Sequence, residues 1–255
     1  MKKSLKHLCA ATAISLCATG HPAAANHRPD NNNNNNNNME TKLNPAEEWD
    51  KVFPQSHQVN HTKVTFHNRY GITLAADLYI PKNASGKLPA IAISGPFGAV
   101  KEQASGLYAQ ALAERGFLTL AFDPSYTGES GGTPRHVASP DINTEDFCAA
   151  VDYLSTREDV NPQQVGILGI CGWGGFALNA AAIDTRIKAT VASTMYDISR
   201  CTANGYFDAM TPDERYRMRQ ELNAQRTRDY KEGTYAPAGG VIDPLPNDAP
   251  QFVKD

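Results

Sequence analysis

The chain has 255 residues, of which 41% are hydrophobic and 20% carry a charge, a balance typical of a globular protein with a sizeable core. The net charge of −3 gives no excess of basic side chains. Neither nucleic acid nor an anionic membrane surface is therefore expected as a partner.

The N-terminal 25 residues have the three parts of a secretory signal peptide. A basic segment, "MKKSLK", precedes a short apolar segment, "LCAATAISLCATG", and "AAA" offers a cleavage site before Asn26. Eight consecutive asparagines follow, so residues 26–45 are predicted to form a disordered linker. We expect an exported protein, periplasmic or extracellular, with no membrane span and a folded domain over 46–255. The alternative is a start at Met39.

Three of the five cysteines lie outside the predicted signal peptide, namely Cys148, Cys171 and Cys201. An odd number in an oxidising compartment leaves at least one free thiol. No Cys or His spacing is typical of a metal site, and we expect neither a metal nor a cofactor.

Hydrophobic patterning predicts alternating strands and helices. Two short alternating segments around a turn predict a hairpin, and continuous apolar runs predict strands that are buried on both faces. The expected elements, in chain order, are a hairpin over 61–68 and 72–81, a strand over 88–94, a helix over 103–115, a strand over 117–123, a helix over 143–156 capped by Asn143, a strand over 165–170 after a turn at "NPQQ", a helix over 174–183 and a buried strand over 187–195. This order predicts an α/β fold, a mostly parallel sheet with helices on both faces.

The alternation stops after Asp197. A charged helix is predicted over 211–230, because Thr211 and Glu214 form a capping box and Pro212 occupies the first helical position. The Pro- and Gly-rich segment that follows contains no further apolar run typical of a buried strand.

The stretch "GILGICGWGG" contains the pattern of a nucleophile elbow. Gly169 and Cys171 fit the register in which the nucleophile follows a strand and begins a helix, and Gly172 and Gly174 are small neighbours. Trp173 stands where a small residue is more usual. A cysteine at a helix N-terminus is expected to have a lowered pKa, which favours the nucleophilic thiolate.

Two backbone amides are candidates for an oxyanion hole. One belongs to Gly172, immediately after the candidate nucleophile. The other belongs to Phe97 in the loop "GPFGAVKEQ", whose glycines permit the unusual backbone angles that aim amides inward. Trp173 and Tyr196 are candidates to line the substrate pocket. Lys101, in the same loop, is expected at the solvated start of a helix.

These stretches resemble a known superfamily. "VGILGIC" followed by glycines is similar to the elbow of dienelactone-hydrolase-type α/β-hydrolases, which use cysteine as nucleophile. The spacing from Cys171 to Gly174 and the loop "DPSYTGESGG" also resemble X-Pro dipeptidyl-peptidase and cocaine-esterase relatives, with Cys in place of Ser. The resemblance covers roughly residues 60–200. It implies a hydrolase of esters, lactones or peptide-like carbonyls, with a small molecule as substrate.

The sequence departs from this pattern because no histidine follows Cys171. The resemblance implies an acid and then a histidine after the elbow; Asp197 lies where some members place the acid. His136 is the one histidine near the expected active-site edge, and a solvated loop position is its other interpretation. We expect a chain that lacks the last strands of its family, has little or no activity, and can self-associate through an open sheet edge.

Three other interpretations remain open at this point. Gly172, Gly174 and Ala177 satisfy the G-x-G-x-x-A pattern of a dinucleotide-binding loop, with Asp197 about 20 residues further on. Cys171 is also compatible with a buried structural thiol. The missing histidine favours a non-catalytic exported binding protein built on a hydrolase scaffold.

Overall fold

A computed structural model describes residues 49–195 and 197–236. The predicted signal peptide and linker lie outside the described residues, as do Tyr196 and the segment 237–255.

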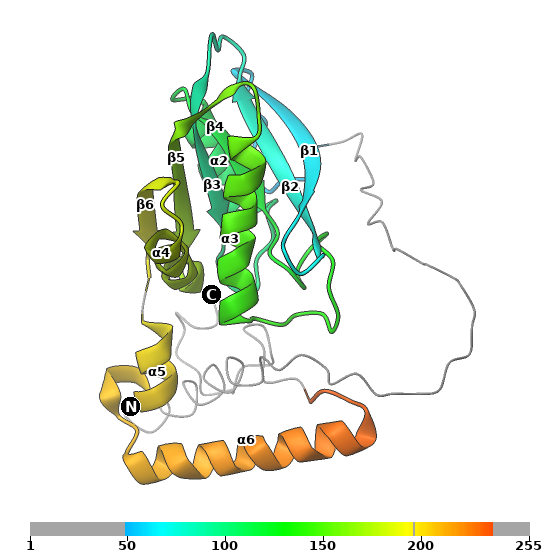
Figure 1. The fold of residues 1–255 in the computed structure, drawn as a ribbon, viewed down its shortest axis with the longest axis vertical. Coiled ribbons are helices and arrows are strands. Elements are labelled where there is room, and N and C mark those ends of the chain that lie inside the picture. Colours follow the sequence, from blue (N-terminus) through cyan, green and yellow to red (C-terminus); the bar gives the residue numbers. More distant parts are fainter. Residues whose placement is uncertain (1–48, 196, 237–255) are drawn as a thin grey trace, which may run out of the picture.

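Six described strands form one sheet. They are β1 (Val59–His67), β2 (Thr73–Pro81), β3 (Leu88–Ser94), β4 (Leu118–Phe122), β5 (Val160–Ile170) and β6 (Ile187–Ser193). Their order across the sheet is β1-β2-β4-β3-β5-β6 (Figure 1). The hairpin β1–β2 is antiparallel, and so is the pair β2–β4, whereas the other three pairs are parallel. The predicted α/β class with a mostly parallel sheet is confirmed.

Helices cover both faces of this sheet. Helix α2 (Ala104–Ala113) packs on one face through Ala109 and Ala113, next to Tyr79 and Ile93 of the strands. Helices α3 (Pro140–Ser155) and α4 (Gly172–Ile183) cover the other face (Figure 1). The chain steps one way across the sheet from β3 to β4 and the other way from β4 to β5 and from β5 to β6. Right-handed crossovers in opposite directions place their helices on opposite faces.

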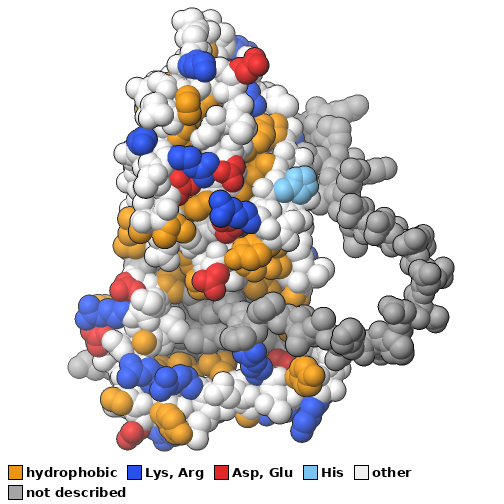
Figure 2. Space-filling model, in the orientation of Figure 1, with side chains coloured by type: hydrophobic (Ala, Val, Ile, Leu, Met, Phe, Trp, Pro, Cys, Tyr) orange, Lys and Arg blue, Asp and Glu red, His pale blue; other side chains and the backbone are white. Residues whose placement is uncertain are grey.

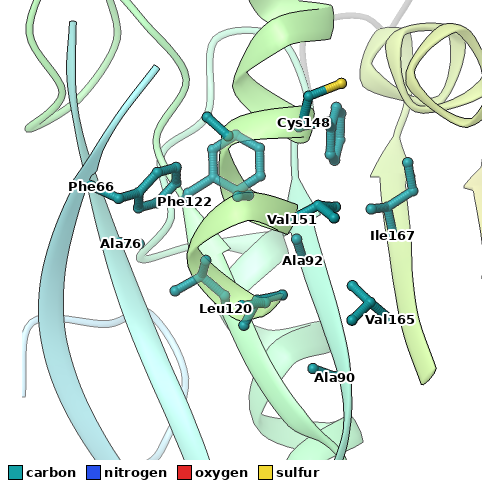
Figure 3. Close-up of a cluster of buried hydrophobic side chains, with 14 of the residues drawn as sticks. Phe66, Ala76, Ala90, Ala92, Leu120, Phe122, Cys148, Val151, Val165 and Ile167 are labelled. Atoms are coloured by element: carbon teal, nitrogen blue, oxygen red, sulfur yellow. The ribbon is translucent and has the colours of Figure 1, made fainter. Parts of the chain in front are cut away.

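The larger part of the core lies between the sheet and α3. Val151 of α3 points toward Ala92 and Ile167 of neighbouring strands, and Phe122 lies beside Phe66 of the hairpin (Figure 3). Phe66 and Phe122 meet edge to face with ring centroids 6.1 Å apart. Aromatic pairs of this kind contribute beyond their buried area, so they tie the antiparallel hairpin to the parallel strands.

The expectation that the last strand is buried is wrong. None of the residues of β6 is buried, and Val191 is 52% exposed. The reason is position, because β6 pairs with β5 alone among the described strands and forms one edge of the sheet. Self-association through this edge stays a prediction.

Two element boundaries differ from the sequence prediction. Helix α3 starts at Pro140, because the Ser139 side chain caps it and Pro140 has the backbone angle of a first turn. Asn143, the predicted cap, is instead buried inside the helix. Strand β5 begins at Val160, and the expected turn at "NPQQ" is an irregularity in its pairing with β3.

The segment after the sheet forms helix α5 (Ile198–Asn204), a 3-10 turn η1 (Tyr206–Asp208) and helix α6 (Pro212–Glu232). They lie beyond the carboxyl ends of β5 and β6 (Figure 1). The predicted capping box of Thr211 and Glu214 is present, and α6 has no buried residue. Charged side chains of both signs are interspersed on the face in Figure 2. Among the helices of the described ranges, none has the length and hydropathy needed to cross a membrane.

Replacing Phe147 by Ala is expected to lower the free energy of unfolding by about 3–5 kcal/mol, because its fully buried ring fills the core between α3 and the strands. The matched control is Phe207→Ala, at a ring that is 88% exposed, with an expected change within about 0.5 kcal/mol. Urea unfolding of both variants measures the difference. Equal losses of stability would contradict this description of the core.

Candidate active site

The backbone at Cys171 makes a strained turn between β5 and α4. Its φ of 58° and ψ of −127° lie where non-glycine residues are rarely found. The Cys171 N–H donates to the carbonyl of Ser193 in β6 at 2.9 Å, so the sheet pairing extends to the turn itself. A partly buried side chain is thus held at the carboxyl edge of the sheet, at the start of a helix.

Two glycines leave the space that this turn needs. A Cβ on Gly169 would lie 2.2 Å from the carbonyl oxygen of Trp173, so the first turn of α4 packs directly on the strand. A Cβ on Gly172 would lie 1.9 Å from the Phe97 ring. The sequence pattern around Cys171 therefore has a steric explanation at both positions.

The same contact places the loop after β3 against the elbow. Besides touching Gly172, the Phe97 ring packs on Trp173 and Phe176 with centroid distances of 5.9 Å in both cases. The two amides predicted as oxyanion donors thus belong to segments in direct contact. Neither the N–H of Phe97 nor that of Gly172 has a hydrogen-bond acceptor among the described residues. Two free amides near a helix N-terminus favour a negatively charged oxygen.

Trp173 points into the core and is 3% exposed. Its ring lies 5.1 Å from Phe176 and 6.2 Å from Phe147, centroid to centroid. The large residue at this elbow position is accommodated because it fills the space between α3, α4 and the Phe97 loop. Contact with a substrate stays a prediction for Trp173.

Asp197 caps helix α5. Its carboxylate accepts hydrogen bonds from the Ser199 hydroxyl at 2.6 Å and from the Arg200 N–H at 2.9 Å, and these bonds hold its pKa below the usual range. The next residue, Ile198, reaches the elbow, with its Cδ1 atom 2.8 Å from the position of a Gly172 Cβ. The structure thus places Asp197 beside the elbow as an exposed cap, and its role as catalytic acid stays a prediction.

The histidines of the described chain lie on other elements. His136 is exposed in the loop between β4 and α3, where its backbone N–H donates to the carbonyl of Tyr126. His61 on β1 bonds through Nε2 to the buried carboxylate of Asp77 at 2.8 Å. Neither of them bonds to Cys171.

The other two cysteines of the described residues lie outside the elbow. Burial raises the pKa of the Cys148 thiol to about 11, and neighbouring carboxylates add to the rise. Burial also raises the pKa of Cys201 on α5. All three thiols are free.

Sequence reasoning missed a buried ionic cluster next to the site. Lys101, expected at a solvated helix start, is 1% exposed, and its ammonium binds Asp123 at 3.0 Å and Glu129 at 2.6 Å. It also pairs with Glu102. Burial alone would lower the pKa of Lys101, but the charge of Asp123 and the bonds to the two glutamates raise it. The local sequence around Lys101, "AVKEQ", gives no sign of partners that lie 22 and 28 residues further along the chain.

The three carboxylates of this cluster have oxygens within 4.8 Å of one another, a spacing that suits a metal ion. The Lys101 ammonium already bonds to all three of them, so a cation of the protein itself balances their charge. Their donor set is therefore explained without a metal.

The sequence profile of the X-Pro dipeptidyl-peptidase (S15) family matches residues 70–236, which include the hairpin turn, the Phe97 loop and the elbow. The chain belongs to this family. The S15 match and the structural neighbours agree with the resemblance drawn from the sequence, and the protein is a member of the α/β-hydrolase superfamily.

Relatives of this family member are bacterial and fungal. It is 64% identical to the uncharacterized protein PA2218 of Pseudomonas aeruginosa over 76% of this chain and 53% of that protein. The crystal structure of PA2218 matches with a TM-score of 0.76 and 60% identity, covering 82% of this chain and 65% of that one.

Two fungal proteins are more distant relatives. The thiohydrolase aneE of Aspergillus aculeatus is 29% identical over 68% of this chain and 52% of that protein. The α/β-hydrolase GrgF from Penicillium sp. sh18 matches with a TM-score of 0.57 and 27% identity, covering 69% of this chain and 56% of that one. The chain spans about half the length of the curated relatives it matches.

Replacing Gly172 by Ala is expected to lower the free energy of unfolding by about 1–3 kcal/mol, because the new methyl group overlaps the Phe97 ring, which Trp173 and Phe176 hold in place. The control is Gly175→Ala in the same helix, where a Cβ meets nothing within 4 Å. This change should stabilise the helix by about 0.5–1 kcal/mol. Thermal unfolding compares them, and a shift of the same sign in both would contradict the close approach of Phe97.

Cys148 is expected to resist iodoacetamide at neutral pH, because the thiolate is the reactive form and its pKa is about 11. The alkylation rate should rise about tenfold per pH unit as the pH approaches that value. Peptide mass spectrometry after timed labelling measures it, with urea-unfolded protein as the control in which burial is removed. Rapid labelling of Cys148 in the folded protein at neutral pH would contradict the assigned shift.

Proposed function

We propose that this protein is an exported hydrolase that acts on an ester, thioester, lactone or peptide-like carbonyl through acylation of Cys171. The observation that carries the proposal is the backbone at Cys171, a non-glycine residue at φ 58° between a parallel strand and a helix. Strain at such a position is retained where the surrounding structure over-determines it, and an elbow of this kind exposes its central side chain for attack.

The proposed reaction begins with the Cys171 thiolate. Its sulfur attacks the carbonyl carbon, and a C–S bond forms while the carbonyl oxygen takes up the negative charge. The N–H groups of Phe97 and Gly172 donate to this oxyanion. Collapse of the intermediate breaks the bond to the leaving oxygen, sulfur or nitrogen, which takes a proton from water and departs as an alcohol, thiol or amine, and leaves a thioester on Cys171. Water then attacks this thioester, and its C–S bond breaks to release the carboxylic acid and the Cys171 sulfur, with one proton returned to solvent.

The second half of this reaction is expected to be slow in this chain. Hydrolysis of a thioester needs a base that activates water, and the histidines of the described residues lie on elements other than the elbow. Acylation depends less on a base than this second step does, because cysteine sulfur is intrinsically a strong nucleophile. The proposal is therefore an enzyme that acylates readily and turns over slowly. The relative named a thiohydrolase supports acyl chemistry as the reaction class.

The structure gives a reason to prefer this proposal to dinucleotide binding. In that alternative, a glycine of the turn lets a pyrophosphate approach the backbone. The space in front of Gly172 is occupied by Phe97 and Ile198, at 1.9 and 2.8 Å from the position of a Cβ. Membership of a hydrolase family supports the same preference.

With p-nitrophenyl acetate, the protein is expected to release a burst of about one p-nitrophenolate per molecule, followed by a slower steady rate. Cys171→Ala should abolish the burst, because it removes the attacking sulfur. Stopped-flow absorbance measures the burst, and peptide mass spectrometry locates the acetyl group.

Cys201→Ala is the matched control, since it removes a half-buried free thiol outside the elbow. It should leave the burst unchanged. A burst that survives Cys171→Ala, or an acetyl group found on another residue, would overturn the proposed function. Equal rates for wild type and Cys171→Ala, with no burst in either, would favour a non-catalytic binding protein.

A further inference from the structure

We infer that Lys101 is a positioning residue for acyl transfer, which fixes the loop carrying the Phe97 amide by binding Asp123 and Glu129. This inference rests on the proposed function, because it assigns a role in the reaction at Cys171. It concerns the loop over residues 95–103, which joins β3 to α2 and whose Phe97 end touches the elbow.

Lys101 joins this loop to β4 through two groups of one residue. Its backbone N–H donates to Oδ1 of Asp123 at 2.8 Å, and its ammonium bonds to Oδ2 of the same carboxylate at 3.0 Å. Both side chains are completely buried. Asp123 directly follows β4, so the loop is attached at two points to the end of a central strand. Two bonds from Lys101 to one carboxylate restrict the orientation of the loop relative to the end of β4 as well as its distance from it.

The same ammonium also reaches the loop that follows β4. It binds Glu129 at 2.6 Å, and the N–H of Glu129 donates to Oδ2 of Asp123 at 2.9 Å. Ser130, the next residue, donates from its hydroxyl to the carbonyl of Asp123 at 2.6 Å and accepts from the N–H of Ala75 at 2.9 Å. Lys101 therefore connects two neighbouring loops at the carboxyl edge of the sheet, and the second loop is itself fixed to β2.

Few contacts within the loop determine where its Phe97 end lies. The hydrogen bonds within the loop are short-range, from the N–H of Ala99 to the carbonyl of Pro96 and between Val100 and Gln103. The Phe97 ring rests on Gly172 and Trp173, but a ring contact alone does not aim a backbone N–H. The bonds of Lys101, four residues further along, supply the fixed point against which the Phe97 amide is oriented. An oxyanion donor loses its effect when it is misplaced by about 1 Å.

The charges around Lys101 predict the effect of removing its ammonium group. Glu102 belongs to the Phe97 loop, whereas Asp123 and Glu129 belong to the end of β4 and the loop after it, and the oxygens of all three lie within 4.8 Å of one another. Without the ammonium, Glu102 would face the other two carboxylates, with Lys63 still bound to Glu129 at 3.1 Å. Repulsion between Glu102 and these carboxylates is expected to displace the Phe97 loop from the loop after β4.

The test measures two reactions of the same sulfur in Lys101→Met. Acylation by p-nitrophenyl acetate passes through an oxyanion and should slow by about 10- to 100-fold, because one donor is misplaced. Alkylation of Cys171 by iodoacetamide displaces iodide at a saturated carbon and forms no oxyanion, so its rate should stay within about twofold of wild type. Stopped-flow burst rates and peptide mass spectrometry give the two rate constants in the full chain.

Lys51→Met is the matched control, because the Lys51 side chain is also completely buried and pairs with Asp77 at 3.1 Å and with Asp50, neither of which lies in the 95–103 loop. Its acylation rate should stay close to wild type even where its melting temperature falls. Asp123→Asn provides a second variant if Lys101→Met does not fold, since Asn keeps a carbonyl acceptor for the Lys101 N–H and loses the charge. It should show the same selective loss of acylation.

The outcomes separate this inference from the proposed function. A burst that depends on Cys171 but keeps its wild-type rate in Lys101→Met and Asp123→Asn overturns the positioning role alone. Acylation and alkylation that fall together, or an equal loss of acylation in Lys51→Met, also overturn it, because a general loss of stability then explains the effect. Absence of any burst that depends on Cys171 in wild type overturns both.

Discussion

The turn at Cys171 is the constraint on which the rest of this edge of the structure depends. The turn at φ 58° brings the first turn of α4 close to residue 169 and the Phe97 ring close to residue 172. Both close approaches are possible only because these two residues are glycines and lack a Cβ. The helix packs directly on Gly169 and the Phe97 ring packs directly on Gly172, so strand, loop and helix are in close contact at the turn. Strain at one residue is thus balanced by close packing at its neighbours.

Two buried carboxylates hold the loops around this turn. Asp123 receives the N–H groups of Lys101 and Glu129, and Asp146 in α3 receives the Ser125 N–H at 2.9 Å and the Asn68 side chain at 2.8 Å. Burial raises the pKa of Asp146 in spite of these bonds. Both carboxylates bind backbone N–H groups of segments that have little regular structure. Buried polar groups with all their partners present fix a loop more specifically than apolar contacts do.

The features that follow from local pattern could be predicted from the sequence. The apolar runs gave β3 its bounds of 88–94, and the register around Cys171 gave the elbow, because both depend on neighbouring residues alone. The exposure of β6 and the burial of Lys101 could not be predicted in this way. The first depends on which strand lies at the sheet edge, and the second on a carboxylate 22 residues away. Hydrophobic periodicity contains neither kind of information.

The same distinction applies to the chemistry of the site. The strained turn at Cys171 is a product of local backbone geometry, so a strand followed directly by a helix suffices to form it. A general base must instead arrive from a segment distant in sequence, because the fold places it on a different loop. In the proposed reaction, cysteine is the nucleophile for which this matters least during acylation, because its sulfur is intrinsically very nucleophilic. The first chemical step of that reaction then depends on the elbow and on the loops fixed around it, and the release of the acyl group is the step that also needs a base from elsewhere in the chain.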